Sequence, residues 1–130
     1  MSLRVYLAVF SKDSEAHGVG VEIIDKNGEV IYIASLYLLR SEFSSQRRLL
    51  QHVIPLILRQ APDDATEITF ISTINYFKKK AEFVRKNRPF VGANVKLDFQ
   101  YLNRLRFDTV SLGIDAVERR NSLSERMSGD

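Results

Sequence analysis

The sequence contains no cysteine and no tryptophan, and it has only two histidines among its 130 residues. Without cysteine the chain cannot form disulfides, cysteine-ligated zinc or iron–sulfur sites, or a thiol nucleophile. His17 and His52 have no third group at a recognisable spacing that would make either a metal ligand or a general base. We therefore expect no metal and no cofactor. Gly18-Val19-Gly20 precedes a strand-like run rather than a helix, which disfavours a phosphate-binding loop.

Long hydrophobic runs are also lacking. The run over residues 30–39 is interrupted by polar residues, and it is far shorter than the roughly 20 residues that span a bilayer. The first residues lead directly into a strand-like run and do not resemble a signal sequence. We therefore expect a cytoplasmic protein with no membrane partner.

The size of the chain bounds its organisation. A chain of 130 residues, 45% of them hydrophobic, is typical of one domain whose packed core needs neither metal nor disulfide. We expect residues 1-120 to form this domain and the polar residues 121-130 to form a disordered tail.

The first forty residues predict three strands. Residues 3–10 are apolar or aromatic at nearly every position, which is typical of an inner strand covered on both faces. Residues 18–24 predict a second strand, and the Asn27-Gly28 turn favours a hairpin into a third strand over residues 29–39. The expected arrangement is an antiparallel meander.

Helical and strand periods alternate after residue 41. The apolar spacing predicts a helix over residues 43–60, with a kink or break at Pro55 because proline removes one backbone hydrogen bond. A short strand follows over residues 67–73, and its helical crossover implies parallel pairing with an earlier strand. The remaining expectations are a basic helix over 76–87, a fifth strand over 95–102 and a last helix over 108–119.

This order of elements resembles the ribonuclease H-like fold, and the resemblance covers residues 3 to about 120. Two segments strengthen it. Residues 67–77, Glu-Ile-Thr-Phe-Ile-Ser-Thr-Ile-Asn-Tyr-Phe, are similar to the family's fourth strand, and the spacing from Ser11 to Gly18 and Gly20 is similar to its first hairpin. The resemblance implies an α/β fold with a five-stranded mixed sheet, three antiparallel strands followed by parallel additions, and helices on both faces.

The resemblance also implies where catalytic carboxylates would lie. In that family four carboxylates hold two magnesium ions, which stabilise the attacking and leaving oxygens of phosphodiester cleavage. Matched by position, they fall on Ser11, Gln46, Ile74 and Asp108, of which only Asp108 is acidic. The sequence therefore predicts no catalytic residues and no enzyme activity, unless Asp13 and Glu42 supply displaced ligands.

Positive charge is concentrated in one segment. Residues 76–106 contain nine Lys and Arg against two acids, a net charge of +7, whereas the other residues carry ten cations against fourteen acids. Aromatic residues interleave with these cations, as in proteins that bind single-stranded nucleic acid. The predicted nucleic-acid-binding residues are Lys78, Lys79, Lys80, Arg85, Lys86, Arg88, Arg104 and Arg106, with Arg47 and Arg48 beside Gln46.

The leading interpretation is a catalytically inactive ribonuclease H-like domain that binds single-stranded nucleic acid or an RNA–DNA hybrid. A solvated helix without a ligand would explain the same charges. Two further alternatives stay open. The apolar run over residues 36–39 cannot all face one core if it lies in a strand, which would suit a protein-interaction or dimerisation domain. A residual metal-dependent nuclease is the other.

Overall fold

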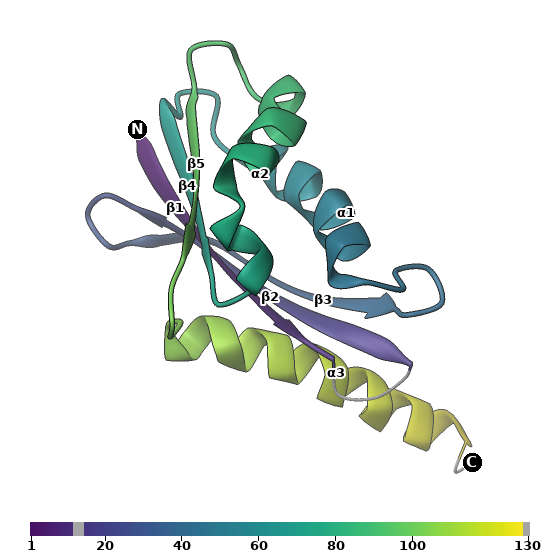
Figure 1. Cartoon of the computed structure of the whole chain (residues 1–130). Helices are drawn as coiled ribbons and strands as arrows, with labels where there is room; N and C mark the ends of the chain where they lie inside the picture. The colour runs from purple at the N-terminus through teal and green to yellow at the C-terminus, as the bar shows by residue number, and fades with distance from the viewer. Residues whose placement is uncertain (12–14, 129–130) are drawn as a thin grey trace.

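The computed structural model describes residues 1–11 and 15–128, with side chains up to residue 118. It contains five strands, three α-helices and two short 3-10 helices. Their bounds are β1 Ser2–Phe10, β2 Ala16–Asp25, β3 Val30–Leu39, α1 Gln46–Leu58, β4 Glu67–Ser72, η1 Asn75–Lys78, α2 Lys80–Asn87, η2 Arg88–Phe90, β5 Lys96–Tyr101 and α3 Phe107–Ser128 (Figure 1).

The strands form one mixed sheet in the order β3-β2-β1-β4-β5. β1 pairs antiparallel with β2, and β2 pairs antiparallel with β3. β4 pairs parallel with β1, and β5 pairs parallel with β4. The antiparallel meander and the parallel additions are thus confirmed. β1 is the central strand, which explains why its residues are apolar on both faces.

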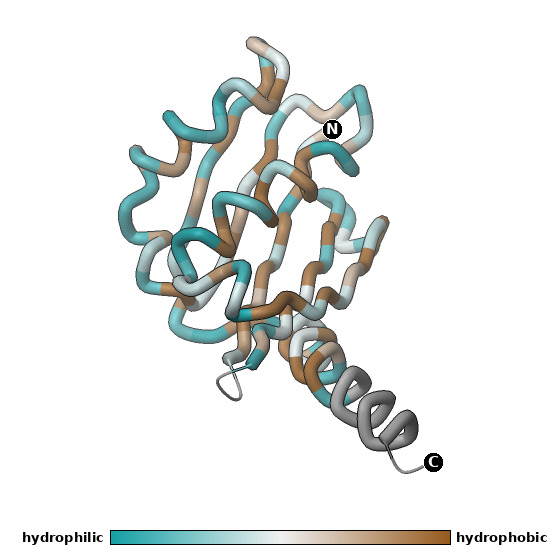
Figure 2. Tube along the Cα trace, turned by 90° about the vertical axis from the view of Figure 1, so that its right-hand side faces the viewer, coloured by the Kyte–Doolittle hydropathy of each residue, from teal (hydrophilic) through white to brown (hydrophobic). Residues whose placement is uncertain are grey.

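One face of the sheet carries the main core. Because side chains alternate along a strand, Val5 of β1, Ile23 of β2 and Phe70 of β4 share this face, and all three are buried. α1 and α2 cover it (Figure 1), and the tube view shows hydrophobic residues along the strands with hydrophilic ones on the outer sides of the helices (Figure 2). Phe70 stacks on Phe99 with ring centroids 5.1 Å apart.

α3 covers the opposite face, and two glycines allow it to approach closely (Figure 1). A Cβ atom on Gly20 would collide with the carbonyl oxygen of Thr109, and one on Gly18 would collide with that of Gly113. Gly113 in turn lies against the ring of Phe10. The Gly-Val-Gly segment of β2 is therefore the place where helix and sheet backbones touch.

Two helices differ from the sequence predictions. α1 was expected to kink or break at Pro55, and a break is excluded because the helix continues through that residue to Leu58. Pro55 is buried in the apolar face of α1, and its carbonyl accepts from the Arg59 N–H. The basic helix expected over 76–87 is divided instead. η1 ends at Lys78, and Lys79, at φ −91° and ψ 52°, separates it from α2.

The last helix is longer than expected. We predicted an end at Arg119 and a disordered tail over 121-130, but α3 extends to Ser128. After Gly113 no glycine or proline occurs before Gly129, so no helix-terminating residue interrupts the segment. Gly129 and Asp130 lie outside the described residues. None of the helices described here combines the length and hydropathy that a membrane span requires.

Candidate nucleic-acid interface and carboxylate positions

Ser11 follows β1 and takes part in a chain of hydrogen bonds. Its hydroxyl lies 2.6 Å from His17 Nδ1, and His17 Nε2 lies 2.9 Å from the Phe43 carbonyl oxygen. Since a carbonyl only accepts, Nε2 carries the proton, and in the neutral ring Nδ1 accepts from the Ser11 hydroxyl. His17 is buried. Ser11, at the position of the first expected carboxylate, therefore links the end of β1 through His17 of β2 to the segment before α1.

The second and third positions also lack metal-binding chemistry. Gln46 is the exposed first residue of α1, directly after the N-cap Ser45, whose hydroxyl accepts from the Arg48 N–H at 3.2 Å. Ile74 is only 7% exposed. Its N–H donates to Ser72 Oγ at 3.3 Å. The Ser72 hydroxyl in turn donates to the Leu7 carbonyl at 2.6 Å. The side chain at the expected carboxylate position after β4 is thus the buried, apolar one of Ile74.

Asp108, the fourth position, lies in the first turn of α3 but not beside Ser11. Its neighbour Thr109 donates to Glu22 Oε1 at 2.5 Å, and Glu22 is directly opposite Tyr6, in the middle of β1. The acid that lines a cavity together with Ser11 is Glu118, farther along α3; this cavity has a volume of about 220 Å³. The sequence alone does not reveal this, because the glycines of β2 set the position of α3 along the sheet.

The described residues contain no group of three His, Asp or Glu side chains that could hold a metal ion. Of the two acids considered as displaced ligands, Glu42 is exposed and lines a different hollow with residues 37–39. Asp13 lies outside the described residues.

Buried Glu22 was missed by the sequence analysis. It is 3% exposed, and besides the Thr109 hydroxyl it accepts from Arg106 Nε at 3.3 Å. The Arg106 guanidinium also lies over the Tyr6 ring, 5.6 Å from the centroid. A glutamate between Val21 and Ile23 in a strand that is otherwise buried is the signal that such a partner exists, since a buried carboxylate needs one.

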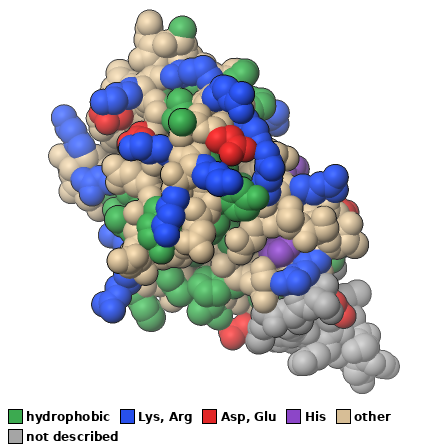
Figure 3. Space-filling view, in the orientation of Figure 1, with side chains coloured by type: hydrophobic (Ala, Val, Ile, Leu, Met, Phe, Trp, Pro, Cys, Tyr) green, Lys and Arg blue, Asp and Glu red, His purple; other side chains and the backbone are tan. Residues whose placement is uncertain are grey.

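Most of the predicted binding residues lie exposed on or near the two helices that cover the main core. Figure 3 shows lysine and arginine side chains gathered over this face, with few acids among them. Lys78 Nζ lies over the Tyr101 ring, 4.5 Å from its centroid, and Lys79 Nζ lies 5.6 Å from that of Tyr76. Within the described part of the chain, no carboxylate pairs with six of the predicted cations, which are Arg48, Lys78, Lys79, Lys80, Arg85 and Arg104.

Two of the predicted cations are used by the fold itself. Arg88 donates to the carbonyl oxygens of Gly92 and Val95, at 2.7 and 2.6 Å, and so holds the loop before β5. Arg106 pairs with Glu22 as described above. Both side chains stabilise the protein locally, which leaves them less free to bind phosphate than Lys80 or Arg85.

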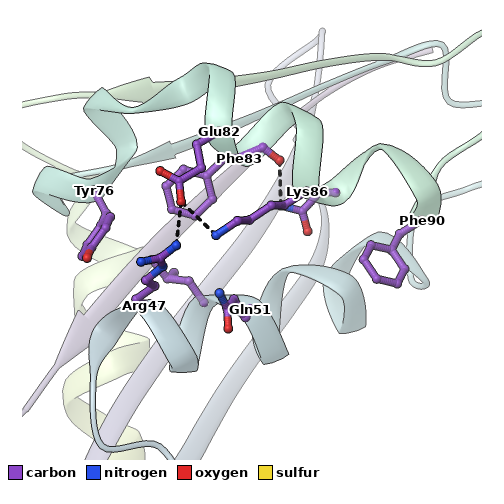
Figure 4. Close-up of a pocket in the computed structure, with 9 residues that line it drawn as sticks. Arg47, Gln51, Tyr76, Glu82, Phe83, Lys86 and Phe90 are labelled. Carbon is purple, nitrogen blue, oxygen red and sulfur yellow. Dashed lines mark hydrogen bonds and ion pairs between the residues drawn. The ribbon is translucent and has the colours of Figure 1, made fainter.

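Arg47 and Lys86 meet at one carboxylate between α1 and α2. Glu82 Oε1 lies 2.9 Å from Arg47 Nη2 and 2.8 Å from Lys86 Nζ (Figure 4). The hydrogen bond from Lys86, aided by the charges of Lys86, Arg47 and Lys79, lowers the pKa of Glu82 below its ordinary value. The three charges therefore form one salt-bridged group, and one carboxylate partly neutralises two cations.

This group borders a cleft of about 270 Å³ between α1 and α2, whose lining includes Leu50 and Phe83. Tyr76 and Phe90 lie on either side of the ion pairs (Figure 4), and Phe90 is 49% exposed. The cleft thus combines the exposed aromatic surface of Tyr76 and Phe90 with cations. Phe83 at its base is almost completely buried, and Phe77 belongs to the core.

Comparison with known proteins supports the fold of this chain but assigns it neither a family nor an activity. No protein-family model and no curated protein matches the sequence. Among solved structures, RNase H1 of Halobacterium salinarum has a TM-score of 0.68 and 12% identity, covering 92% of this chain and 99% of that one. LC11-RNase H1 in complex with an RNA/DNA hybrid has a TM-score of 0.59 and 14% identity, with the same two coverages.

A third similar structure is ribonuclease H2 from Pyrococcus horikoshii, with a TM-score of 0.60, 10% identity, and coverage of 98% of this chain and 76% of that one. With the strand order and helix placement described above, these likenesses define the architecture. The chain has a ribonuclease H-like fold, in which the resemblance predicted from its sequence is confirmed.

Proposed function

We propose that this protein binds a nucleic-acid strand, single or within an RNA–DNA hybrid, on the face formed by α1, η1 and α2, and that it does not hydrolyse it. The observation that carries the proposal is a set of exposed cations on this face that have no carboxylate partner among the described residues, next to a cleft with exposed aromatic surface. Cations neutralise phosphates and rings stack on bases, so the two together suit a strand with accessible bases.

Two further observations support the proposal. A similar structure, LC11-RNase H1, is in complex with an RNA/DNA hybrid, so the fold accommodates this ligand in at least one protein. The lack of hydrolysis is argued from chemistry. Ser11, Gln46 and buried Ile74 provide no anionic oxygens, and hard divalent cations need such oxygens to be held for phosphodiester cleavage.

Fluorescence anisotropy with four labelled polymers tests the binding. Single-stranded DNA, single-stranded RNA, duplex DNA and an RNA–DNA hybrid are titrated at two salt concentrations with Mg²⁺ present. We expect binding that weakens steeply with salt. The double variant Lys80→Ala/Arg85→Ala should weaken binding and lower the salt slope by about 1.4 on single strands, because each phosphate contact contributes about 0.7.

The matched control is Arg4→Ala/Lys26→Ala, which removes the same charge from the face of the sheet opposite α1 and α2 and from the β2–β3 hairpin. Equal losses in both pairs would mean that net charge alone, not this face, attracts the ligand. Absence of binding to all four polymers would overturn the proposal and favour a protein-interaction role.

The same samples, run on a denaturing gel, test the second half of the proposal. We expect intact strands after prolonged incubation with Mg²⁺. Cleavage that Glu118→Gln or Asp108→Asn abolishes would show instead that acids of α3 support a residual metal-dependent nuclease.

A further inference from the structure

β3 forms one edge of the sheet. It pairs with β2 on one side only, and no described strand pairs with its other side. Alternate residues of an edge strand direct backbone N–H and C=O groups outward, where they can pair with another strand. With ten residues, β3 offers a long edge of this kind.

Soluble proteins usually protect such an edge with charges, proline, or a short or bulged strand. Residues 30–39 contain no charged residue, no proline and no glycine. Val30, Ile31 and Ile33 are 45%, 41% and 58% exposed. The opposite edge, β5, has only six residues and includes Lys96 and Asp98. The pairing of β3 with β2 is irregular at Ile31, between the pairs Ile24–Val30 and Ile23–Tyr32, so the regular, uncharged edge of β3 is formed by residues 32–39.

The helices leave this edge accessible. α3 approaches most closely at Gly18 and Gly20 of β2, and it reaches β3 through the Ser35 hydroxyl, which donates to the Leu112 carbonyl at 2.6 Å. Ile33 lies on the same face as Ser35 by alternation and stays exposed. On the other face, Ala34 and Leu36 are only partly buried at the margin of the core.

We propose that β3 pairs antiparallel with β3 of a second copy of this chain, which joins the two five-stranded sheets into one sheet of ten strands. A strand without charge can meet its own copy without like-charge repulsion, and a two-fold axis makes the two surfaces complementary by symmetry. The exposed isoleucines of both copies then become buried at the junction.

The charges that flank β3 also favour its own copy as the partner. Glu29 precedes the strand and Arg40 follows it. When the two strands overlap over most of their length, Glu29 of one copy lies near Arg40 of the other, at both ends of the junction. Among the described residues Arg40 has no carboxylate partner, and its Nε atom is buried without a hydrogen bond.

The geometry restricts the dimer further. Residues directly opposite each other in a sheet point to the same face, so the two-fold axis stands perpendicular to the sheet. Along residues 32–39 odd-numbered residues then pair with odd-numbered ones, and the irregularity at Ile31 places Glu29 by alternation on the face that carries Arg40. Both pairs of α1 and α2 helices lie on one side, and both α3 helices lie on the other. If the nucleic-acid face proposed above is correct, the two basic faces are on the same side and can contact one strand together.

Light scattering coupled to size exclusion tests the dimer on the full chain without nucleic acid. We expect a mass twice the 14.9 kDa of the monomer, with dissociation on dilution. Ile33→Lys should give a monomer, whereas Leu56→Lys, which alters another exposed apolar residue on α1, should not. Circular dichroism of both variants shows that they are folded. A wild-type monomer at every concentration, or a dimer that survives Ile33→Lys, overturns the proposal.

Exchange of the two flanking charges adds a sharper test. Glu29→Arg alone and Arg40→Glu alone should each weaken the dimer, because each places like charges together at both ends of the junction. The double variant should restore it. If the double variant is weaker than both single ones, the antiparallel arrangement is wrong. All these measurements omit nucleic acid, so their failure leaves the proposed binding function to be judged by its own titrations.

Discussion

Single residues occupy the positions where the sequence resemblance predicted carboxylates. At the end of β1, the Ser11 hydroxyl forms a hydrogen bond with His17 Nδ1, and His17 Nε2 donates to the Phe43 carbonyl. Both ring nitrogens are therefore used for structure, and neither is available to a metal ion. At the end of β4, the buried side chain at the expected carboxylate position is the apolar Ile74. At these two positions the described side chains serve local packing and hydrogen bonding.

Glu82 is the residue that limits the proposed binding face. Its carboxylate forms ion pairs with both Arg47 and Lys86. A phosphate must therefore compete with Glu82 for these two cations. We expect Glu82→Gln to bind single strands more tightly than the wild type. Its salt slope should be steeper by up to about 1.4, from two added phosphate contacts at about 0.7 each. Anisotropy titrations measure this, and Asp63→Asn in an exposed loop is the control for net charge.

The pH dependence of the same variant provides a second measurement. Because Lys86, Arg47 and Lys79 lower the pKa of Glu82, the carboxylate stays ionised below the ordinary range of glutamate. Wild-type binding should strengthen only as the pH falls through this lowered pKa, when protonation releases the two cations. Glu82→Gln should lack that increase. Weaker binding by Glu82→Gln, or identical pH profiles, would contradict the assigned role.

At the scale of elements, the contact between α3 and β2 depends on glycine. Gly20→Ala places a methyl group against the Thr109 carbonyl, and neither backbone can move without disturbing the Glu22–Thr109 hydrogen bond. We expect a loss of about 1–3 kcal/mol in the free energy of unfolding, which is typical of overpacking, measured by urea denaturation.

Gly92→Ala is the matched control for that substitution. A Cβ at Gly92 would lie 3.6 Å from Val95 Cγ2, an ordinary contact, and we expect little change in stability. Equal losses at both glycines would mean that the close approach of α3 does not explain the effect, because the lower entropy of the unfolded alanine chain would by itself raise stability at both positions.

The elements and the directions of strand pairing were largely predictable from sequence, and contacts between side chains far apart in the sequence were not. Alternation and the three-and-four spacing identified the strands and α1, because burial imposes these periods on the residues themselves. The bridge from Glu82 to Arg47 joins residues 35 positions apart, and the place of Asp108 along the sheet follows from where the glycines of β2 let α3 rest. Neither leaves a local pattern.

At the scale of the whole molecule, charge and apolar surface are separated. The cations without partners lie mainly on the side of α1 and α2, whereas the uncharged edge is β3, at one end of the sheet. Two interactions of different physical origin can therefore coexist on one small domain. Nucleic-acid binding releases counterions and weakens with salt, but strand pairing depends on backbone hydrogen bonds and apolar burial, which salt does not screen.

This difference predicts how the two interactions respond to ionic strength. With four phosphate contacts to a single strand, a four-fold rise in salt should weaken nucleic-acid binding by roughly 50-fold. The dimer mass should stay unchanged over the same range. Anisotropy and light scattering on the same samples measure the two responses. If both interactions weakened together, electrostatics would hold the dimer, and the apolar edge of β3 would not be its basis. If neither weakened, phosphate contacts would not explain the binding.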